Sequence, residues 1–126
     1  MEIAPVSGGR DLERFIAFPY EHYRGHPLWV PQLRMDVRTL LSPGKNPFFQ
    51  HAAAQYFLAR SDGRTVGRIA AIKNDAHNDI HQDRVGFYGF FEAVDDQAVA
   101  NPLWDAAGEW LRARGFDTMR GPMSPS

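Results

Sequence analysis

The sequence has 126 residues, of which 44% are hydrophobic and 23% are charged. These proportions are typical of one folded globular domain and exclude a fully disordered chain. Its 14 basic and 15 acidic side chains give a formal net charge of -1, so we expect no nucleic-acid partner, which would need a basic surface. The absence of cysteine excludes disulfides, thiolate catalysis and cysteine-ligated metal centres. Because neither a signal-peptide pattern nor a run of about 20 apolar residues is present, we expect a cytoplasmic protein without a membrane partner.

The N-terminal residues predict an edge strand followed by a helix. Residues 3–6 read as the strand, and Pro5 confines it to a sheet edge or a strand end. Asp11 is a suitable N-cap for the helix. The apolar face of this helix consists of side chains at helical spacing, namely Leu12, Phe15 and Ile16. Pro19 is expected to interrupt or restart the helix.

A second helix is predicted over residues 33–41, whose apolar side chains share one face. The pair Pro43-Gly44 ends this helix. The preceding stretch, Trp29-Val30-Pro31, is expected to be extended because a residue before proline avoids helical angles.

The middle of the chain predicts three strands arranged as a meander, over residues 55–60, 65–72 and 85–92. Between the first two strands, Ser61-Asp62-Gly63-Arg64 is a tight-turn sequence, because Asp-Gly tolerates the positive φ angles of a two-residue hairpin. The third strand is followed by Asp95 or Asp96 as the cap of a short turn.

The polar stretch over residues 75–83 reads as a loop. His77 and His81 have a four-residue spacing, and on a helix they would share a face and could ligate a divalent metal. The stretch has no helical pattern, so we favour a solvated loop and predict no metal site.

The C-terminal part predicts one helix and a last strand. Asn101 is a suitable N-cap with Pro102 at the first helical position, and Gly115 ends the helix just after Arg114. Residues 116–120 form the strand. This order of elements predicts an α/β fold in which helices pack on a mixed, mostly antiparallel sheet.

Five stretches spread over almost the whole chain carry a family resemblance. They are residues 23–31 (YRGHPLWVP), 45–49 (KNPFF), 66–72 (VGRIAAI), 86–92 (GFYGFFE) and 121–126 (GPMSPS). Together they resemble the first part of the GNAT (GCN5-related N-acetyltransferase) fold, in particular that of long bacterial GNAT-like proteins. The resemblance implies a single GNAT-like domain over residues 1–126, the N-terminal portion of a fold whose C-terminal strands and helix are missing. A linker-like tail is the alternative explanation for residues 121–126.

The resemblance also implies an activity. A GNAT-like protein would be an acyl-CoA-dependent N-acyltransferase, which moves the acyl group of acetyl-CoA or another acyl-CoA to a small-molecule or peptide amine. The acyl-pantetheine arm would lie along the backbone of one strand end, formed by Phe90, Phe91, Glu92, Ala93 and Val94. Glu92 would take the proton from the attacking amine, with Phe90 and Phe91 desolvating its carboxylate. The alternative for Glu92 is a strand-end glutamate in solvent.

One segment departs from the GNAT pattern. The family has a Gly-rich loop of the form Q/R-x-x-G-x-G/A, whose N–H groups cradle the cofactor pyrophosphate together with the following helix start. Residues 93–102 contain no glycine and include Asp95 and Asp96, which would repel a phosphate. This departure favours a second hypothesis, a non-catalytic GNAT-like module that binds a ligand or a protein partner.

Two further features are candidates for the site. Arg68 lies within an apolar strand, so its charge must face solvent, a partner carboxylate or a ligand phosphate. Structural pairing is the favoured interpretation. Trp29-Val30-Pro31 and Phe48-Phe49 would either line an acceptor pocket or pack in the core.

Overall fold

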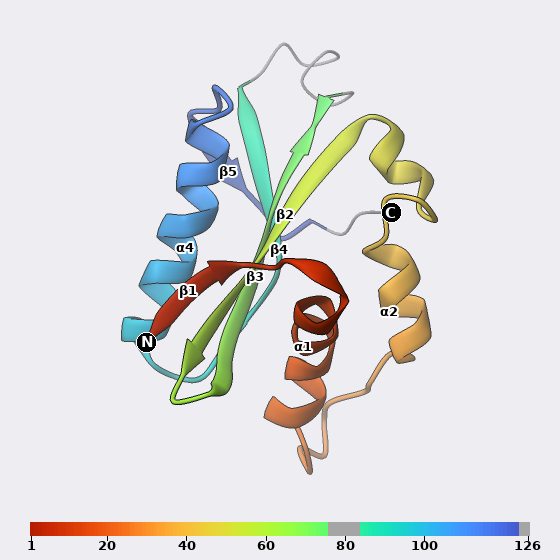
Figure 1. Cartoon of the computed structure of the whole chain (residues 1–126), viewed down its shortest axis with the longest axis vertical. Coiled ribbons are helices and arrows are strands. Elements are labelled where there is room, and N and C mark those ends of the chain that lie inside the picture. Colours follow the sequence, from red (N-terminus) through yellow and green to blue (C-terminus); the bar gives the residue numbers. More distant parts are fainter. Residues whose placement is uncertain (76–83, 124–126) are drawn as a thin grey trace.

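The computed structural model describes residues 1–75 and 84–123, and this part of the chain forms one sheet with helices on both faces (Figure 1). The elements in chain order are β1 (Glu2–Pro5), α1 (Gly8–His22), α2 (Arg34–Leu40), a 3-10 turn (Pro47–Gln50), β2 (Ala52–Ser61), β3 (Arg64–Asn74), β4 (Val85–Ala93), α4 (Gln97–Arg112) and β5 (Thr118–Arg120). This order confirms the predicted succession of strand, two helices, three strands, helix and strand.

The sheet is mixed and mostly antiparallel, as predicted. Its strand order is β1-β2-β3-β4-β5, in which the first four strands are antiparallel neighbours and β5 runs parallel to β4. The β2–β3 hairpin closes through Asp62 and Gly63, which have φ angles of 51° and 76°. Positive φ at both positions is what a two-residue hairpin turn of the expected type requires.

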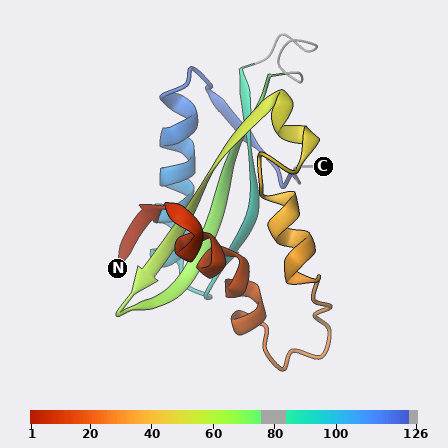
Figure 2. The same cartoon turned by 45° about the vertical axis from the view of Figure 1, so that its right-hand side comes forward.

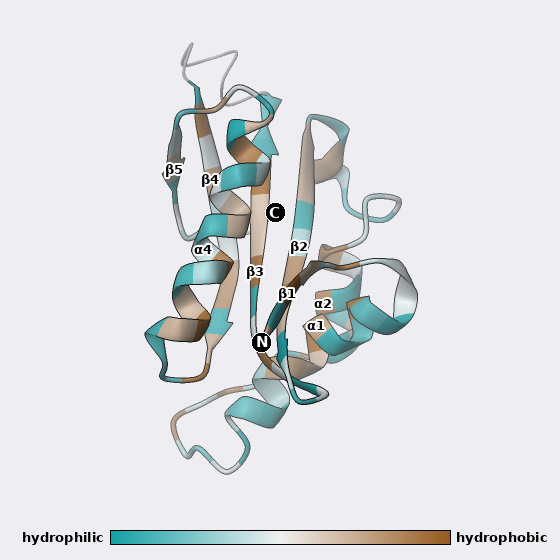
Figure 3. Cartoon of the chain, turned by 60° about the vertical axis from the view of Figure 1, so that its left-hand side comes forward, coloured by the Kyte–Doolittle hydropathy of each residue, from teal (hydrophilic) through white to brown (hydrophobic). Residues whose placement is uncertain are grey.

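The helices divide the core into two layers. α1 and α2 cover one face of the sheet and α4 covers the other (Figures 1 and 2). Side chains alternate between the faces, so Leu58 and Ile72 pack with α1 and α2, whereas Phe57 and Ile69 pack with α4. Hydrophobic colour accordingly concentrates where helices and strands meet, and hydrophilic colour on the outer sides of the helices (Figure 3).

The expected start of the last helix was wrong. α4 begins at Gln97, and Asp96 is its N-cap, with its carboxylate accepting the Ala98 N–H at 2.9 Å. Pro102 therefore lies inside the helix, where it removes one intrahelical hydrogen bond. The turn before the proline is stabilised because Val99 is buried against the sheet. This contribution comes from tertiary packing, so capping and proline signals in the sequence do not reveal it.

The first helix also begins earlier than predicted. Ser7 occupies the N-cap position of α1, and Asp11 lies in the first turn, where its carboxylate accepts the Ser7 N–H at 3.1 Å. The helix continues through Pro19 to His22, so the proline does not interrupt it. A side chain from the sheet accounts for this tolerance, as described below.

The last predicted strand differs in length from the strand in the structure. β5 is shorter than predicted and covers only Thr118–Arg120.

His77 and His81 lie outside the described residues. Within residues 1–75 and 84–123, no group of three or more His, Asp or Glu side chains is arranged to hold a metal ion, and no helix has the length and apolar character needed to cross a bilayer.

Candidate functional site

An irregularity in β4 decides which of its side chains face α1. Gly89 pairs with Ala70 of β3, but Glu92 pairs with Arg68, so the two residues between them on β4 oppose a single residue on β3. Phe90 has a φ of 54°, in the left-handed region that residues other than glycine seldom adopt. One extra residue with such an angle is a β-bulge, a device that turns later side chains to the other face of the sheet.

The bulge brings Glu92 to the α1 face. Phe87 lies on that face, and strict alternation from it would place Glu92 on the α4 face with Tyr88. Instead Phe90 packs with the α1-side core, whereas Phe91 packs against Trp104 of α4 with ring centroids 4.9 Å apart. Of the two phenylalanines expected to desolvate the Glu92 carboxylate, only Phe90 therefore lies on its face.

Glu92 is half-buried and hydrogen-bonded to a phenol. The Tyr23 hydroxyl, from the residue that ends α1, donates to Glu92 Oε2. This hydrogen bond, and then burial, raises the pKa of Tyr23 to about 12, because ionisation would place two negative charges together. The phenol therefore stays protonated at neutral pH and can hold the carboxylate in one position. The alternative of a fully solvated strand-end glutamate does not apply.

Arg68 lies beneath this pair and is the single buried charged residue of the described ranges, with 6% of its surface exposed. Its guanidinium Nη1 donates to the Phe15 carbonyl oxygen at 2.8 Å. In a regular helix that carbonyl would accept the N–H of residue 19, which is a proline and has none. Arg68 thus supplies the hydrogen bond that Pro19 removes from α1, which explains why the helix continues.

The rest of the Arg68 environment is aromatic and acidic. Its guanidinium lies over the rings of Phe15 and Phe90, 4.9 and 5.6 Å from their centroids. Burial lowers the pKa of Arg68 to about 10, while the charge of Glu92 opposes that shift, so the side chain remains cationic at neutral pH. Its Nε has no hydrogen-bond partner among the described residues. Within the described residues Arg68 forms no ion pair, and its hydrogen-bond partner is the backbone of α1 instead of the carboxylate that structural pairing would require.

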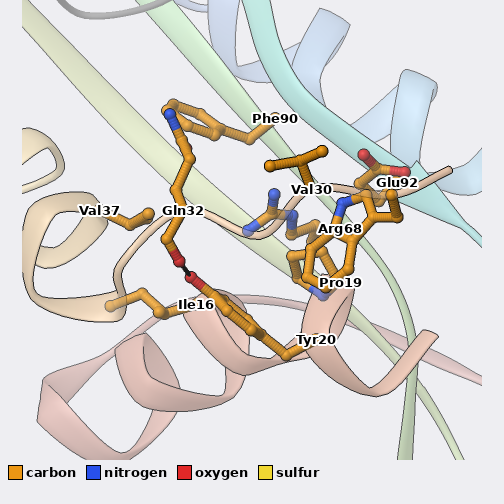
Figure 4. A pocket seen from close by; sticks show the side chains of 10 residues that line it. Ile16, Pro19, Tyr20, Val30, Gln32, Val37, Arg68, Phe90 and Glu92 are labelled. Atoms are coloured by element: carbon orange, nitrogen blue, oxygen red, sulfur yellow. Dashed lines mark hydrogen bonds between the residues drawn. The ribbon is translucent and has the colours of Figure 1, made fainter. Parts of the chain in front are cut away.

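These side chains line a cavity of about 340 Å³ between the sheet, α1 and the α1–α2 connection, a size within the usual range for small-ligand sites. Figure 4 shows Phe90, Arg68 and Glu92 of the sheet facing α1 and the connection. The other lining residues are Ile16, Pro19, Tyr20, Trp29, Val30, Gln32 and Val37. Trp29 and Val30 thus lie where an acceptor pocket would be, whereas Phe48 packs against the α1-side core.

An aromatic cluster holds the connection over the cavity. The Trp29 ring stacks on Tyr23 at 5.5 Å and meets Tyr20 edge-on at 5.3 Å. The Tyr20 hydroxyl also donates to the Gln32 carbonyl oxygen. Sequence reasoning did not identify the two tyrosines, but their signal was present: Ile16, Tyr20 and Tyr23 follow an i, i+4, i+7 spacing and share a helix face.

β4 and β5 separate beside the bulge. β5 pairs with β4 over Val85–Phe87, and one later hydrogen bond joins the Met123 N–H to the Tyr88 carbonyl oxygen at 2.9 Å. Beyond Tyr88, β4 has no strand neighbour on this side within the described ranges. An extended ligand arm could therefore run along Phe90, Phe91 and Ala93. Val94 fits this role less well, because its N–H donates to the Val66 carbonyl oxygen at 2.9 Å.

The start of α4 does not fit a pyrophosphate in the usual GNAT manner. The Ala98 N–H is bonded to the Asp96 carboxylate, and the Val99 N–H donates to the Asp96 carbonyl oxygen at 3.0 Å. Asp95 and Asp96 are both exposed and acidic, so they oppose an anion at this helix terminus. The start of α4 therefore does not fit the phosphates of such a cofactor.

Solved structures share this architecture. A tandem GNAT protein from the clavulanic acid biosynthesis pathway superposes with a TM-score of 0.70 and 17% identity, over 94% of this chain and 35% of that one. An aminoglycoside acetyltransferase from an uncultured soil metagenomic sample, in complex with sisomicin, gives a TM-score of 0.64 and 11% identity over 97% of this chain and 77% of that one. The chain has the GNAT fold. A ribosomal-protein-alanine N-acetyltransferase from Brucella melitensis is a further neighbour of the GNAT domain, with a TM-score of 0.59 and 19% identity over 97% and 81% of the two chains.

Curated relatives are similar at higher sequence identity. A bacterial ceramide synthase from Caulobacter vibrioides is 41% identical over 100% of this chain and 33% of its own length. Protein YghO from Escherichia coli is 37% identical over 90% of this chain and 29% of its own length. The chain thus spans about a third of the length of these relatives. No family model matches it.

Proposed function

We propose that this GNAT domain belongs to an N-acyltransferase that moves an acyl group from acyl-CoA to an amine. The observation that carries the proposal is the position of Glu92, which the bulge in β4 turns into a cavity beside the separated edge of the same strand. A carboxylate within reach of both a ligand arm and a pocket is what a general base for amine attack requires.

In this reaction Glu92, Tyr23 and Phe90 would each have a separate role. Glu92 accepts a proton from the acceptor amine as it attacks. The Tyr23 hydroxyl, which donates to Glu92 Oε2, holds the carboxylate in place, and Phe90 shields it from water. Backbone groups of Phe90, Phe91 and Ala93 receive the acyl-pantetheine arm along the edge of β4 that has no strand neighbour in the described part of the chain. A bound acyl-CoA would supply the activated thioester. The new amide bond would replace its carbon–sulfur bond, and coenzyme A would leave as the thiol.

The phosphates of the cofactor require another set of cations, because the start of α4 is capped. Val94, at the end of β4, also lines a second cavity of about 350 Å³ whose wall carries Arg14, Arg60 and Arg64. Glu21 is the carboxylate on the same wall. We propose that these guanidinium groups bind the phosphates, since arginine matches the geometry of phosphate oxygens.

The similarity to named proteins supports an amine acceptor but leaves its class open. The neighbours include an aminoglycoside acetyltransferase and a ribosomal-protein-alanine N-acetyltransferase. The relative named a ceramide synthase points to an amine on an aliphatic chain, since ceramides are amides of long-chain amino alcohols. Several apolar side chains in the cavity wall, namely Ile16, Val30, Val37 and Phe90, would accommodate such an acceptor better than a highly charged one.

Calorimetric titration with acetyl-CoA and with a long-chain acyl-CoA tests the proposal. We expect saturable binding of at least one of them, and amide formation when an amine acceptor is added. The Arg64→Gln variant should weaken the binding of acyl-CoA but not that of an acyl-pantetheine without the nucleotide. Absence of binding at millimolar ligand would overturn the proposal.

The second candidate is a non-catalytic GNAT-like module that binds a ligand or a protein partner. The capped start of α4, with Asp95 and Asp96 at the position of the usual phosphate cradle, favours it. This function predicts either no acyl-CoA binding or binding without turnover, and no effect of Glu92→Gln on any chemical step.

A further inference from the structure

Large exposed apolar side chains are concentrated in one segment of the described chain. Apart from Met1 at the terminus, they are Leu28, Val30, Leu33 and Met35, which are 84%, 84%, 71% and 72% exposed. All of them lie in or just after the α1–α2 connection, which extends beyond the sheet in Figure 2. Isolated exposed leucines are ordinary, but four in eight successive positions form a patch that calls for a partner.

The charged side chains inside the segment that carries this patch are of one sign. Residues 24–35 contain two arginines, Arg24 and Arg34, and no aspartate or glutamate. Both arginines are exposed and neither forms an ion pair within the described ranges. Arg34 is held over the Tyr20 ring at 4.6 Å. The carboxylates nearest in sequence, Glu21 and Asp36, lie just outside both ends of the segment.

Aromatic side chains form the inner layer of the segment. Trp29 is half-buried between the cavity and the patch, in contact with Tyr20 and Tyr23. Segments that lie in the interface of an anionic bilayer typically combine three features. They have exposed aliphatic side chains, cations beside them, and tryptophan or tyrosine behind them. Such peripheral contact needs no membrane-spanning helix, so it is compatible with the lack of one in the described chain.

We propose that residues 24–35 form a docking surface for an anionic lipid bilayer. Leu28, Leu33 and Met35 enter the interface, and Arg24 and Arg34 pair with lipid phosphates. This partner differs from the sequence-based expectation, which considered membrane-spanning segments only. Because Trp29 and Val30 belong both to the segment and to the cavity wall, the cavity would open close to the lipid surface. If the proposed acyl transfer holds, the acceptor would be an amphiphilic amine taken from that surface, and this last step alone depends on the proposed function.

Co-sedimentation with vesicles tests the surface. The probes are vesicles of phosphatidylcholine alone and vesicles of equal parts phosphatidylcholine and phosphatidylglycerol. We expect binding to the anionic vesicles that weakens with salt. The triple variant Leu28→Ser, Leu33→Ser and Met35→Ser should lower the partition coefficient about tenfold or more, because three apolar side chains no longer leave water. These side chains are exposed and outside the cavity, so the fold should persist, which circular dichroism would check.

Two further comparisons separate charge from apolar insertion. Arg24→Gln and Arg34→Gln should each weaken binding to anionic vesicles by about fivefold. The matched exposed pair Arg112→Gln, at the end of α4, and Arg120→Gln, at the end of β5, should leave binding unchanged. In the wild type, tryptophan emission should shift to shorter wavelength on vesicle addition and be quenched by brominated lipid. The Trp29→Phe variant should lose both effects.

Three results would overturn the proposal. One is the absence of binding to anionic vesicles, and another is equal binding by the wild type and the triple serine variant. The third is a wild-type protein that self-associates in light scattering, with the triple variant monomeric and no vesicle binding, because the patch would then be a protein–protein interface.

Discussion

The two faces of the sheet are formed by the same strands but differ in how tightly the helices pack against them. On the α4 face the helix lies close against the sheet: a Cβ at Gly67 would come within 2.7 Å of Leu103, and the Trp104 ring packs against Tyr88 and Phe91. On the α1 face the packing leaves a cavity and encloses a charged arginine.

The features that recur at functional sites lie on one of the two faces. Close apolar packing is the arrangement that stabilises a domain most. A buried guanidinium, a half-buried carboxylate and a residue with positive φ each cost stability and recur at functional sites. All three occur on the α1 face of the sheet, as Arg68 of β3 and as Glu92 and Phe90 of β4. Substitutions on the two faces should therefore differ in their effects on activity and on stability.

Glu92→Gln should separate activity from stability. If Glu92 is the general base, amide formation should fall by about a hundredfold to ten thousandfold, while the urea midpoint changes little. The isosteric amide keeps the contact with Tyr23, so the loss would be chemical. Steady-state kinetics with an amine acceptor measures it, and an unchanged kcat would remove Glu92 from the mechanism.

Leu103→Ala should lower stability and leave ligand binding intact. Leu103 is fully buried on the α4 face, so its truncation should reduce the free energy of unfolding by about 3 kcal/mol. Acyl-CoA binding by the folded fraction should be preserved. Chemical denaturation and calorimetry on the same samples provide the two readouts, and a large loss of affinity in folded protein would contradict the division between the faces.

Arg68→Met should destabilise the α1 face by about 1–3 kcal/mol, because the Phe15 carbonyl loses its donor and Glu92 loses a nearby cation. Adding Pro19→Ala should recover part of this loss, since residue 19 then has an N–H that can donate to Phe15. A double-mutant cycle by urea unfolding measures the coupling. Additive effects would show that Arg68 does not replace the proline's missing hydrogen bond.

The Tyr23–Glu92 hydrogen bond predicts a pH dependence. The folded-state pKa of Tyr23 is about 12 against an ordinary value of 10, so the stability that this bond contributes should be complete below pH 10. It should be lost as the pH rises from 10 through about 12. Comparing the wild type with Tyr23→Phe removes the opposing contributions of Arg68 and the other tyrosines. If the stability difference between the two proteins stays constant across this window, the hydrogen bond is not formed in solution.

Asp96→Ala should have the smallest effect, about 1 kcal/mol, from loss of the helix cap. Asp96→Ser keeps a capping oxygen without the charge and should be nearly neutral. Thermal unfolding distinguishes them. Equal losses in both variants would mean that the charge, and not the cap, stabilises the start of α4.

The order of elements could be predicted because it depends on local signals. The Asp62-Gly63 turn and the apolar strands on either side of it define the hairpin without reference to the rest of the chain. The start of α4 could not be placed correctly, because the helix begins at Gln97 and buries Val99, two residues before the predicted cap at Asn101. Likewise the continuation of α1 through Pro19 depends on Arg68, which is 49 positions further along the chain.

The site was predictable only in part. Glu92 and the strand end were identified from the family resemblance, and the structure places Glu92 in the cavity. The face of the sheet to which Glu92 points could not be predicted, because the bulge at Phe90 reverses the alternation of side chains along β4. Position 90 is a phenylalanine, so the sequence has no glycine there to indicate a positive φ. Tyr23 was missed because its hydrogen bond joins residues 69 positions apart.

Amide chemical shifts of the isotopically labelled protein, recorded by NMR during a titration with acetyl-CoA, would show which face of the sheet binds the cofactor. We predict that the largest shifts occur at Phe90–Ala93 and at Tyr23, with only small changes along α4 after its first turn. An absence of shifts with both acetyl-CoA and a long-chain acyl-CoA at millimolar concentration, or shifts concentrated on α4 and its face of the sheet, would contradict the proposed assignment of function to the α1 face.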